Sequence, residues 1–127
     1  MSVTPLTGAG AAIATTLRTL ADAGIDATRD AGAFYPQPVG VLVGLPTLLR
    51  RTFAGATYEV PVLVVSGDPL NEELPVDRLY ALADDCARAI GTDTYRPSSY
   101  QTSANAEPLP AIELAQILTL IETIEEA

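Results

Sequence analysis

Histidine and lysine are absent from this 127-residue chain, and cysteine occurs once, as Cys86. Without histidine, neither a Ser-His-Asp nor a Cys-His catalytic arrangement can form, and most transition-metal sites lose their usual ligand. A single cysteine allows no disulfide within the chain and no thiolate cluster, so Cys86 is predicted to be a small core residue. These absences argue against an enzyme, and we expect no catalytic, metal-binding or cofactor-binding residues.

Positive charge is also scarce, because seven arginines stand against sixteen acidic residues, for a net charge of −9. A protein that grips nucleic acid needs a basic patch for the phosphates, so we expect DNA at most to pass nearby without being held. The sequence begins without a basic segment followed by an apolar block. Its longest apolar run, Val39 to Leu49, is broken by Pro46 and is too short to cross a membrane. We therefore expect a soluble protein in a reducing compartment.

Length and composition predict a single domain, residues 1–127, with one core. Apolar residues make up 48% of the chain and charged residues 18%, which is the composition of a globular protein. There are no internal repeats, and no biased linker divides the chain. We expect a flexible N-terminus at residues 1–7, a polar loop at 101–110 and a C-terminal tail at 123–127.

The stretch from Val39 to Ser66 is predicted to organise the fold. Two runs rich in β-branched residues, Val39–Val43 and Tyr58–Ser66, flank a Gly-containing connection and predict an antiparallel pair of strands. Both faces of the second run are apolar, so we expect helices to cover one face and further protein to cover the other. Pro61, within the second run, predicts an edge strand or a bulge. The two faces are Val60, Val62 and Val64 on one side and Pro61, Leu63 and Val65 on the other.

Two helices are predicted on either side of this stretch. The first runs from Ala11 to Ala23 and ends at Gly24 in a left-handed conformation, with Ile25 packing back on Leu20. The second begins at Leu74-Pro75 and ends before Gly91, with Asp84 and Arg88 as an i,i+4 ion pair. Its expected buried face consists of Leu79, Ala83, Cys86 or Ala87, and Ile90.

Shorter apolar segments complete the predicted sheet. Ile25–Arg29 alternates as a short strand, and part of Thr94–Thr102 is a second candidate. The last segment, Ala111–Ile124, fits either a helix or a strand to about Glu122, and its β-branched content and prolines favour the strand. The expected fold is therefore α+β, with a mixed, mostly antiparallel sheet of four to five strands and two helices packed on one face.

Arginine and tyrosine side chains are the candidates for contacts with a partner. Arg50-Arg51 is the one basic doublet, and it is interpreted either as a solvated loop pair or as a contact with acidic residues of another subunit. Tyrosine combines an apolar body with a polar tip, which suits an interface as well as the outer edge of a sheet. The candidate interface residues are Tyr35, Arg50, Arg51, Tyr58, Arg96 and Tyr100.

The order of these features resembles the tail terminator proteins of long-tailed, siphovirus-type phages. The absence of lysine beside abundant alanine, glycine, threonine and arginine is typical of a GC-rich genome, which suits an actinobacterial phage. The resemblance covers residues 11–122. Its segments are the helix end Ala23-Gly24-Ile25, the apolar strand from Tyr35-Pro36 to Leu45-Pro46, the strand Tyr58–Gly67, the helix Leu79–Ile90, the loop Tyr95–Tyr100 and the closing segment Leu109–Leu114.

This resemblance implies a structural virion protein that forms a ring, expected to be a hexamer. Such a ring caps the tail tube, ends its growth and meets the head–neck connector, so the implied partners are the chain itself, the tail tube protein and the connector. DNA would pass through the lumen without specific binding. The protein would be located at the tail–neck junction after assembly in the host cytoplasm.

Two other functions remain open at this point. A head-completion or stopper protein of the neck is the alternative within the same class. A small ligand-binding α+β domain is the alternative from another class, with a pocket lined by Tyr58, Tyr95, Arg96 and Tyr100. A ring would distinguish the assembly protein from a closed monomer or dimer.

Overall fold

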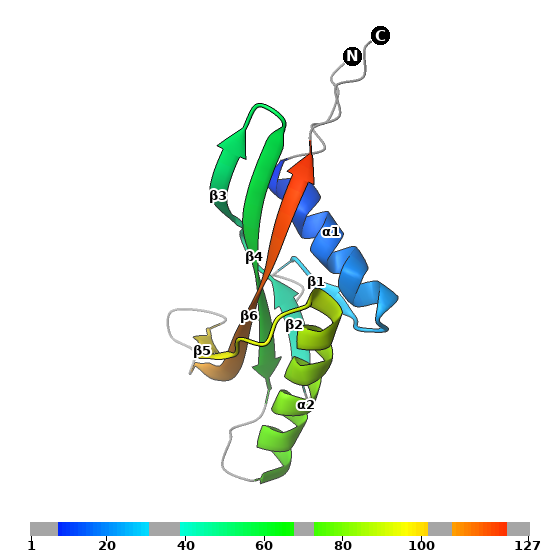
Figure 1. Ribbon diagram of the computed structural model, residues 1–127. Helices are drawn as coiled ribbons and strands as arrows, with labels where there is room; N and C mark the ends of the chain where they lie inside the picture. Colours follow the sequence, from blue (N-terminus) through cyan, green and yellow to red (C-terminus); the bar gives the residue numbers. More distant parts are fainter. Residues whose placement is uncertain (1–7, 31–38, 68–72, 102–107, 122–127) are drawn as a thin grey trace.

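The computed structural model describes residues 8–30, 39–67, 73–101 and 108–121. It confirms the predicted α+β class, because two helices lie on one face of an open, mixed sheet of six strands (Figure 1). The expected N-terminal segment, most of the polar loop and the C-terminal tail lie outside the described residues. In chain order the elements are α1 (Ala9–Asp22), β1 (Ala27–Thr28), β2 (Val39–Val43), β3 (Thr47–Thr52), β4 (Gly55–Ser66), α2 (Glu73–Ile90), β5 (Arg96–Tyr100) and β6 (Leu109–Ile121).

Strand β4 is the centre of the sheet. It has 12 residues and pairs antiparallel with β6 from Gly55 to Val65. On its other side it has two neighbours in succession: β3 pairs with its first half and β2 with its second half. The order β1-β2-β4-β6-β5 is completed by a parallel β1–β2 pair and an antiparallel β5–β6 pair. The predicted antiparallel pairing of Val39–Val43 with Tyr58–Ser66 is therefore confirmed.

The edge position predicted from Pro61 is wrong, since β4 is central. Pro61 is tolerated because it lies between the two neighbours, after β3 pairs up to Glu59 and before β2 pairs from Val62. Its carbonyl accepts a hydrogen bond from the Gly44 N–H at 2.9 Å, on the side where the β2–β3 connection passes. A backbone N–H at this position would point to that same side, away from β6. The proline therefore removes no hydrogen bond between β4 and β6. A Cβ at Gly44 would lie 3.0 Å from the Pro61 ring, which explains the glycine.

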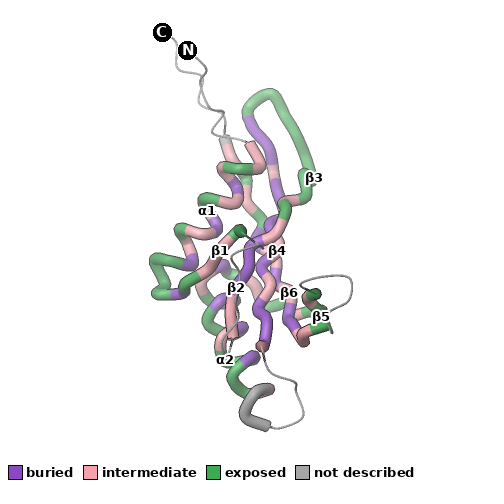
Figure 2. Tube along the Cα trace, turned by 180° about the vertical axis from the view of Figure 1, so that it is seen from behind, coloured by how far each residue is buried: buried purple, intermediate pink, exposed green. Residues whose placement is uncertain are grey.

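Residues 47–52 were expected to be part of a connection, and the structure shows them to be a strand. Strand β3 turns at Phe53-Ala54 directly into β4, and its register shifts between Leu48 and Arg50. We call β3, this turn and the first half of β4 the hairpin arm. Figure 2 shows β3 and the turn as a continuous exposed run. Because Leu48-Leu49-Arg50-Arg51 has no alternation of apolar and polar residues, its period could not predict a strand.

The end of α1 has the predicted geometry. The Ile25 N–H donates to the Leu20 carbonyl and the Gly24 N–H to the Ala21 carbonyl, both at 2.9 Å, which is a Schellman motif. Gly24 has φ of 79°, a conformation that an L-residue with a Cβ adopts only with strain. Ile25 and Leu20 are both buried in the main core, so the motif also fixes the turn into β1.

We expect Gly24→Ala to lower the free energy of unfolding by about 1 kcal/mol, because alanine is strained at positive φ. The matched control is Gly10→Ala on the exposed side of the same helix, where an added Cβ meets nothing within 4 Å. That change should raise stability by about 0.5–1 kcal/mol, because alanine favours the helix interior. Urea denaturation of both variants checks this pair, and shifts of the same sign would contradict the assignment of Gly24.

Helix α2 starts at Glu73, slightly before the predicted start at Leu74-Pro75. Its predicted face is buried, and both Cys86 and Ala87 belong to it. The predicted pair of Asp84 with Arg88 is wrong. Arg88 instead contacts Asp85 at 2.6 Å, and Asp84 accepts a 2.6 Å hydrogen bond from the Tyr95 hydroxyl.

Strand β6 settles the ambiguous last segment as a strand, and the helical alternative is wrong as far as Ile121. Gln116, the residue that fitted the strand pattern poorly, points to the helix side and is buried. Its Oε1 accepts a 2.8 Å hydrogen bond from the Thr16 hydroxyl on α1. This buried pair joins the first helix to the last strand and removes the cost of an unpaired amide oxygen in the core.

Replacing Thr16 by valine keeps the shape of the side chain but removes the donor to Gln116. We expect a loss of about 1–2 kcal/mol of stability, because the amide oxygen stays buried without this partner. Adding Gln116→Met should recover much of the loss, because both members of the pair are then apolar. A double-mutant cycle in urea measures the coupling, and strictly additive effects would show that the bond contributes nothing.

Candidate interaction surface

The two faces of the sheet differ in what covers them. The main core lies between the sheet and both helices and includes Val60, Val62 and Val64, as predicted for one face. The opposite face has a smaller cluster formed by Leu42, Val65 and Ala111, with Leu63, Tyr100 and Leu109 packed against it. Beyond this cluster, Ile117 is 57% exposed. We call this side, which carries Glu59, Pro61, Glu113, Ala115 and Ile117, the helix-free face.

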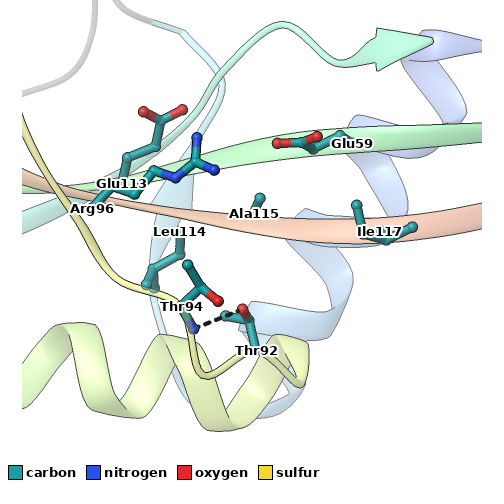
Figure 3. Close-up of a pocket in the computed structure, with 8 residues that line it drawn as sticks. All are labelled: Glu59, Thr92, Thr94, Arg96, Glu113, Leu114, Ala115 and Ile117. Atoms are coloured by element: carbon teal, nitrogen blue, oxygen red, sulfur yellow. Dashed lines mark hydrogen bonds between the residues drawn. The ribbon is translucent and has the colours of Figure 1, made fainter. Parts of the chain in front are cut away.

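A hollow of about 210 Å³ lies on this face beside the outer edge of β6. It forms because β5 pairs with β6 only as far as the Arg96–Glu113 position, so the edge of β6 is open from Leu114 onward within the described residues. The hollow is lined by Glu59, Thr92, Thr94, Arg96, Glu113, Leu114, Ala115 and Ile117 (Figure 3).

The charges around the hollow do not balance. Figure 3 shows the Arg96 guanidinium on the side where the carboxylates of Glu59 and Glu113 also lie. Two carboxylates stand against one guanidinium, and none of these three groups forms an ion pair within the described residues. The hollow therefore has spare negative charge that a cation from outside the chain can meet. Its volume is below the roughly 300–1,000 Å³ of a typical small-molecule site.

The hairpin arm presents apolar side chains to solvent. Phe53 at its turn is 104% exposed and Leu45 just before it is 82% exposed, while Leu48 and Leu49 are about half exposed. The outer edge of β3 has no strand beside it in the described part of the chain. An exposed, apolar edge strand is a site where another chain can pair, and natural proteins rarely leave one without a use.

Arg50 and Arg51 lie on this arm, both exposed. Their register partners on β4 are Thr57 and Ala56, which are uncharged. Within the described residues neither arginine forms an ion pair. The doublet is thus exposed in the single chain, which fits both interpretations, and it lies on a strand and not in a loop.

The remaining predicted interface residues are scattered. Tyr35 lies outside the described residues. Tyr58 is 4% exposed and packs in the main core, so its side chain is not on the surface of this chain. Arg96 lines the hollow, whereas Tyr100 packs in the smaller cluster and Tyr95 packs against the main core. The structure therefore does not assemble a pocket from Tyr58, Tyr95, Arg96 and Tyr100.

Sequence reasoning missed the carboxylates of the hollow and the apolar part of the arm. Glu59 and Glu113 had a detectable signal, since each is a lone charge inside an apolar strand. Phe53 had a weaker one, as an aromatic residue in a turn. Leu48 and Leu49 had none, because an exposed leucine cannot be told from a buried one without knowing the register.

Elsewhere in the described residues, the groups that often carry chemistry are either buried or solitary. No cluster of three or more Asp, Glu, Cys or His side chains is placed to hold a metal ion. Burial, aided by the negative charge of Asp85, raises the pKa of the Cys86 thiol to about 12. This thiol therefore stays protonated at neutral pH and is not an activated nucleophile.

None of the helices in the described residues is both long and apolar enough to cross a membrane. Comparison with known proteins adds no relative, because no family model, no curated protein and no solved structure matches the chain.

Proposed function

We propose that this chain is a structural subunit that assembles into a ring, and specifically a tail terminator of a siphovirus-type phage. The observation that supports this most is the hairpin arm, with its open edge, its exposed leucines and phenylalanine and its two unpaired arginines. These are features of a surface that another subunit covers. The order of elements that resembles the terminator family adds the specific role: capping the tail tube, ending its growth and joining the connector.

The energetics of the arm favour assembly over a free monomer. Full burial of a large apolar side chain contributes about 1.5–3 kcal/mol, and the arm together with Leu45 just before it offers four such groups at partial to full exposure. Their sum is comparable with the lower part of the roughly 4–15 kcal/mol that association costs in lost freedom. A single contact of this kind is weak, but each subunit of a closed ring makes two contacts, so the ring is more stable than a dimer.

The charge of the chain suits a ring around DNA. A net charge of −9 repels phosphates, so a lumen that exposes carboxylates lets DNA slide without sticking. We infer that the partners are the chain itself, the tail tube and the head–neck connector, and that the protein sits at the tail–neck junction of the virion after assembly in the host cytoplasm.

The test has two parts. Light scattering and negative-stain imaging of the purified protein at high concentration should show rings of about six subunits, in keeping with closed cyclic symmetry. Particles assembled without this protein should have tails of uncontrolled, greater length. A monomer at every concentration, together with tails of normal length, would refute the proposal.

The same experiments address the other functions. Tails of normal length that fail to join heads would favour a stopper or head-completion protein of the neck. A small ligand-binding domain is less well supported, because the hollow at Arg96 is small and the tyrosines expected to line it lie elsewhere.

A further inference from the structure

We propose that β3 of one copy adds to the open edge of β6 of the next copy, so that Arg50 meets Glu59 and Glu113 of that neighbour. Arg50 pairs with Thr57 and so shares the face of Glu59, whereas Arg51 is on the helix side of the sheet. This inference rests on the proposed self-assembly and specifies the contact that builds the ring. The occupant of the hollow and of the adjoining β6 edge is therefore the hairpin arm of a second copy.

The two open edges lie at opposite sides of the same half of the sheet. Strand β3 pairs on one side of β4, and β6 pairs on the other side. In the half of the sheet that holds the arm, the outer edge of β3 and the outer edge of β6 beyond Leu114 are both open in the described residues. Each edge has backbone N–H and C=O groups that an added strand would satisfy.

A contact between these two edges has the symmetry that a ring requires. The two edges belong to different strands and face opposite directions, so joining them is a head-to-tail contact in which every copy offers one edge and receives the other. Such heterologous contacts repeat from copy to copy and close into a ring when the rotation between copies allows it. Pairing β3 with β3 would instead stop at a dimer.

The hairpin arm and the hollow are complementary in charge and in apolar contact. The arm carries two arginines without an ion pair, and the hollow carries two glutamates against one arginine. Ile117 is exposed beside the hollow, where it can contact Leu48 or Leu49 of the arriving strand. Ion pairs exposed to water contribute about 0.2–1 kcal/mol each, and pairs shielded within an interface contribute more.

The arm cannot make this contact within its own chain. Strand β4 separates β3 from β6, so the two strands are about 9.6 Å apart, twice the spacing between neighbouring strands. Arg50 therefore meets the outer edge of β6 only in another molecule.

Exchanging the charges tests the contact. The arm-reversed variant carries Arg50→Glu, and the face-reversed variant carries Glu59→Arg and Glu113→Arg. Each variant alone should assemble at least tenfold more weakly than the natural chain, because like charges then meet at every contact. An equimolar mixture should recover ring formation, because each reversed arm meets a reversed face in an alternating ring.

Three outcomes of this exchange would overturn the proposal. Undiminished assembly of the arm-reversed variant would show that Arg50 is not in the contact. Normal assembly of the face-reversed variant alone would indicate that arms pair with arms. Failure of the mixture, with both variants folded by circular dichroism, would show that these charges do not meet. Should the half-buried Glu59 not tolerate arginine, Glu59→Gln with Glu113→Gln should still weaken assembly.

Disulfide trapping tests the same contact without changing its charges. Chains with one cysteine on β3, at Thr47 or Leu49, and one on β6, at Ile117 or Thr119, should give a ladder of covalent oligomers on mild oxidation. A disulfide within one chain is excluded. It requires two Cα atoms within about 7 Å of each other, and β3 and β6 of one chain lie farther apart. The buried Cys86 does not interfere.

The control pairs the same β3 cysteines with Ala81→Cys on the exposed side of α2, which should give no ladder. Rings that form without a ladder from any of the four β3–β6 pairs would overturn this contact but leave the proposed assembly intact. The absence of rings from the natural chain would instead refute the proposed function itself. The two failures are therefore distinguishable.

Discussion

Replacing Leu79 by alanine should lower the free energy of unfolding by about 3 kcal/mol, within the 2–5 kcal/mol range for truncating a large core side chain. Leu79 is 2% exposed and packs in the main core, where α2 meets β4, β6 and β2. The loss combines the apolar surface no longer buried with the cavity left behind. Against a total stability of about 5–15 kcal/mol for a small domain, this is a large fraction.

Leu45→Ala is the matched control, because it removes the same atoms from a side chain that is 82% exposed. Its effect on the dilute monomer should stay within about 0.5 kcal/mol. Urea denaturation at low protein concentration measures both, with a lower midpoint and an unchanged slope expected for Leu79→Ala. Equal midpoints for the two variants would mean that α2 is not docked as described.

Raising the pH from 8 to 10 should destabilise the protein by about 1 kcal/mol through Cys86 alone. The pKa of this thiol rises from an ordinary value of 9.0 to about 12 in the folded chain, because burial and then the Asp85 charge oppose the thiolate. Between those values the unfolded chain releases a proton that the folded chain keeps. The contribution of Cys86 to stability is therefore fully present below pH 9, and it is lost as the pH rises toward 12.

The composition makes this measurement unusually clean. The chain has no lysine and no histidine, so side chains of these two kinds add nothing to the pH dependence. The hydrogen bond to Asp84 raises the pKa of Tyr95, so this tyrosine acts in the same direction near pH 10. Cys86→Ala removes the thiol and should flatten the pH dependence, although its stability at pH 7 falls. An unchanged slope in Cys86→Ala would contradict the assignment.

Patterns of local sequence were enough for the helices and for most of the sheet. Gly24 and Gly91 both have positive φ at the ends of α1 and α2, where a glycine after an apolar repeat predicts a helix end. Runs of valine and isoleucine predicted β2, β4 and β6, because β-branched residues fit a pleated, buried surface. These signals depend on a residue and its near neighbours in the chain, so no tertiary contact was needed to find them.

Strand β3 and the arrangement of the surface required the tertiary structure. Thr47–Thr52 has no alternation, and it is a strand because the first half of β4 offers a free edge once β2 has ended. The same pairing explains why Pro61 is tolerated inside a central strand, since it lies between the residues that pair with β3 and those that pair with β2. Gln116 does not fit the apolar pattern of its strand. It is buried because the Thr16 hydroxyl, 100 residues earlier in the chain, donates a hydrogen bond to it.

The sequence by itself determined the α+β class, the helix ends, the buried role of Cys86 and the absence of histidine-dependent chemistry. Only the tertiary structure decided which residues share a surface. It brought Glu59, Arg96 and Glu113 around one hollow and placed Arg50 and Arg51 on a separate arm. The physical reason is that composition and period act along the chain, whereas a binding surface depends on strand register and on which edges remain unpaired.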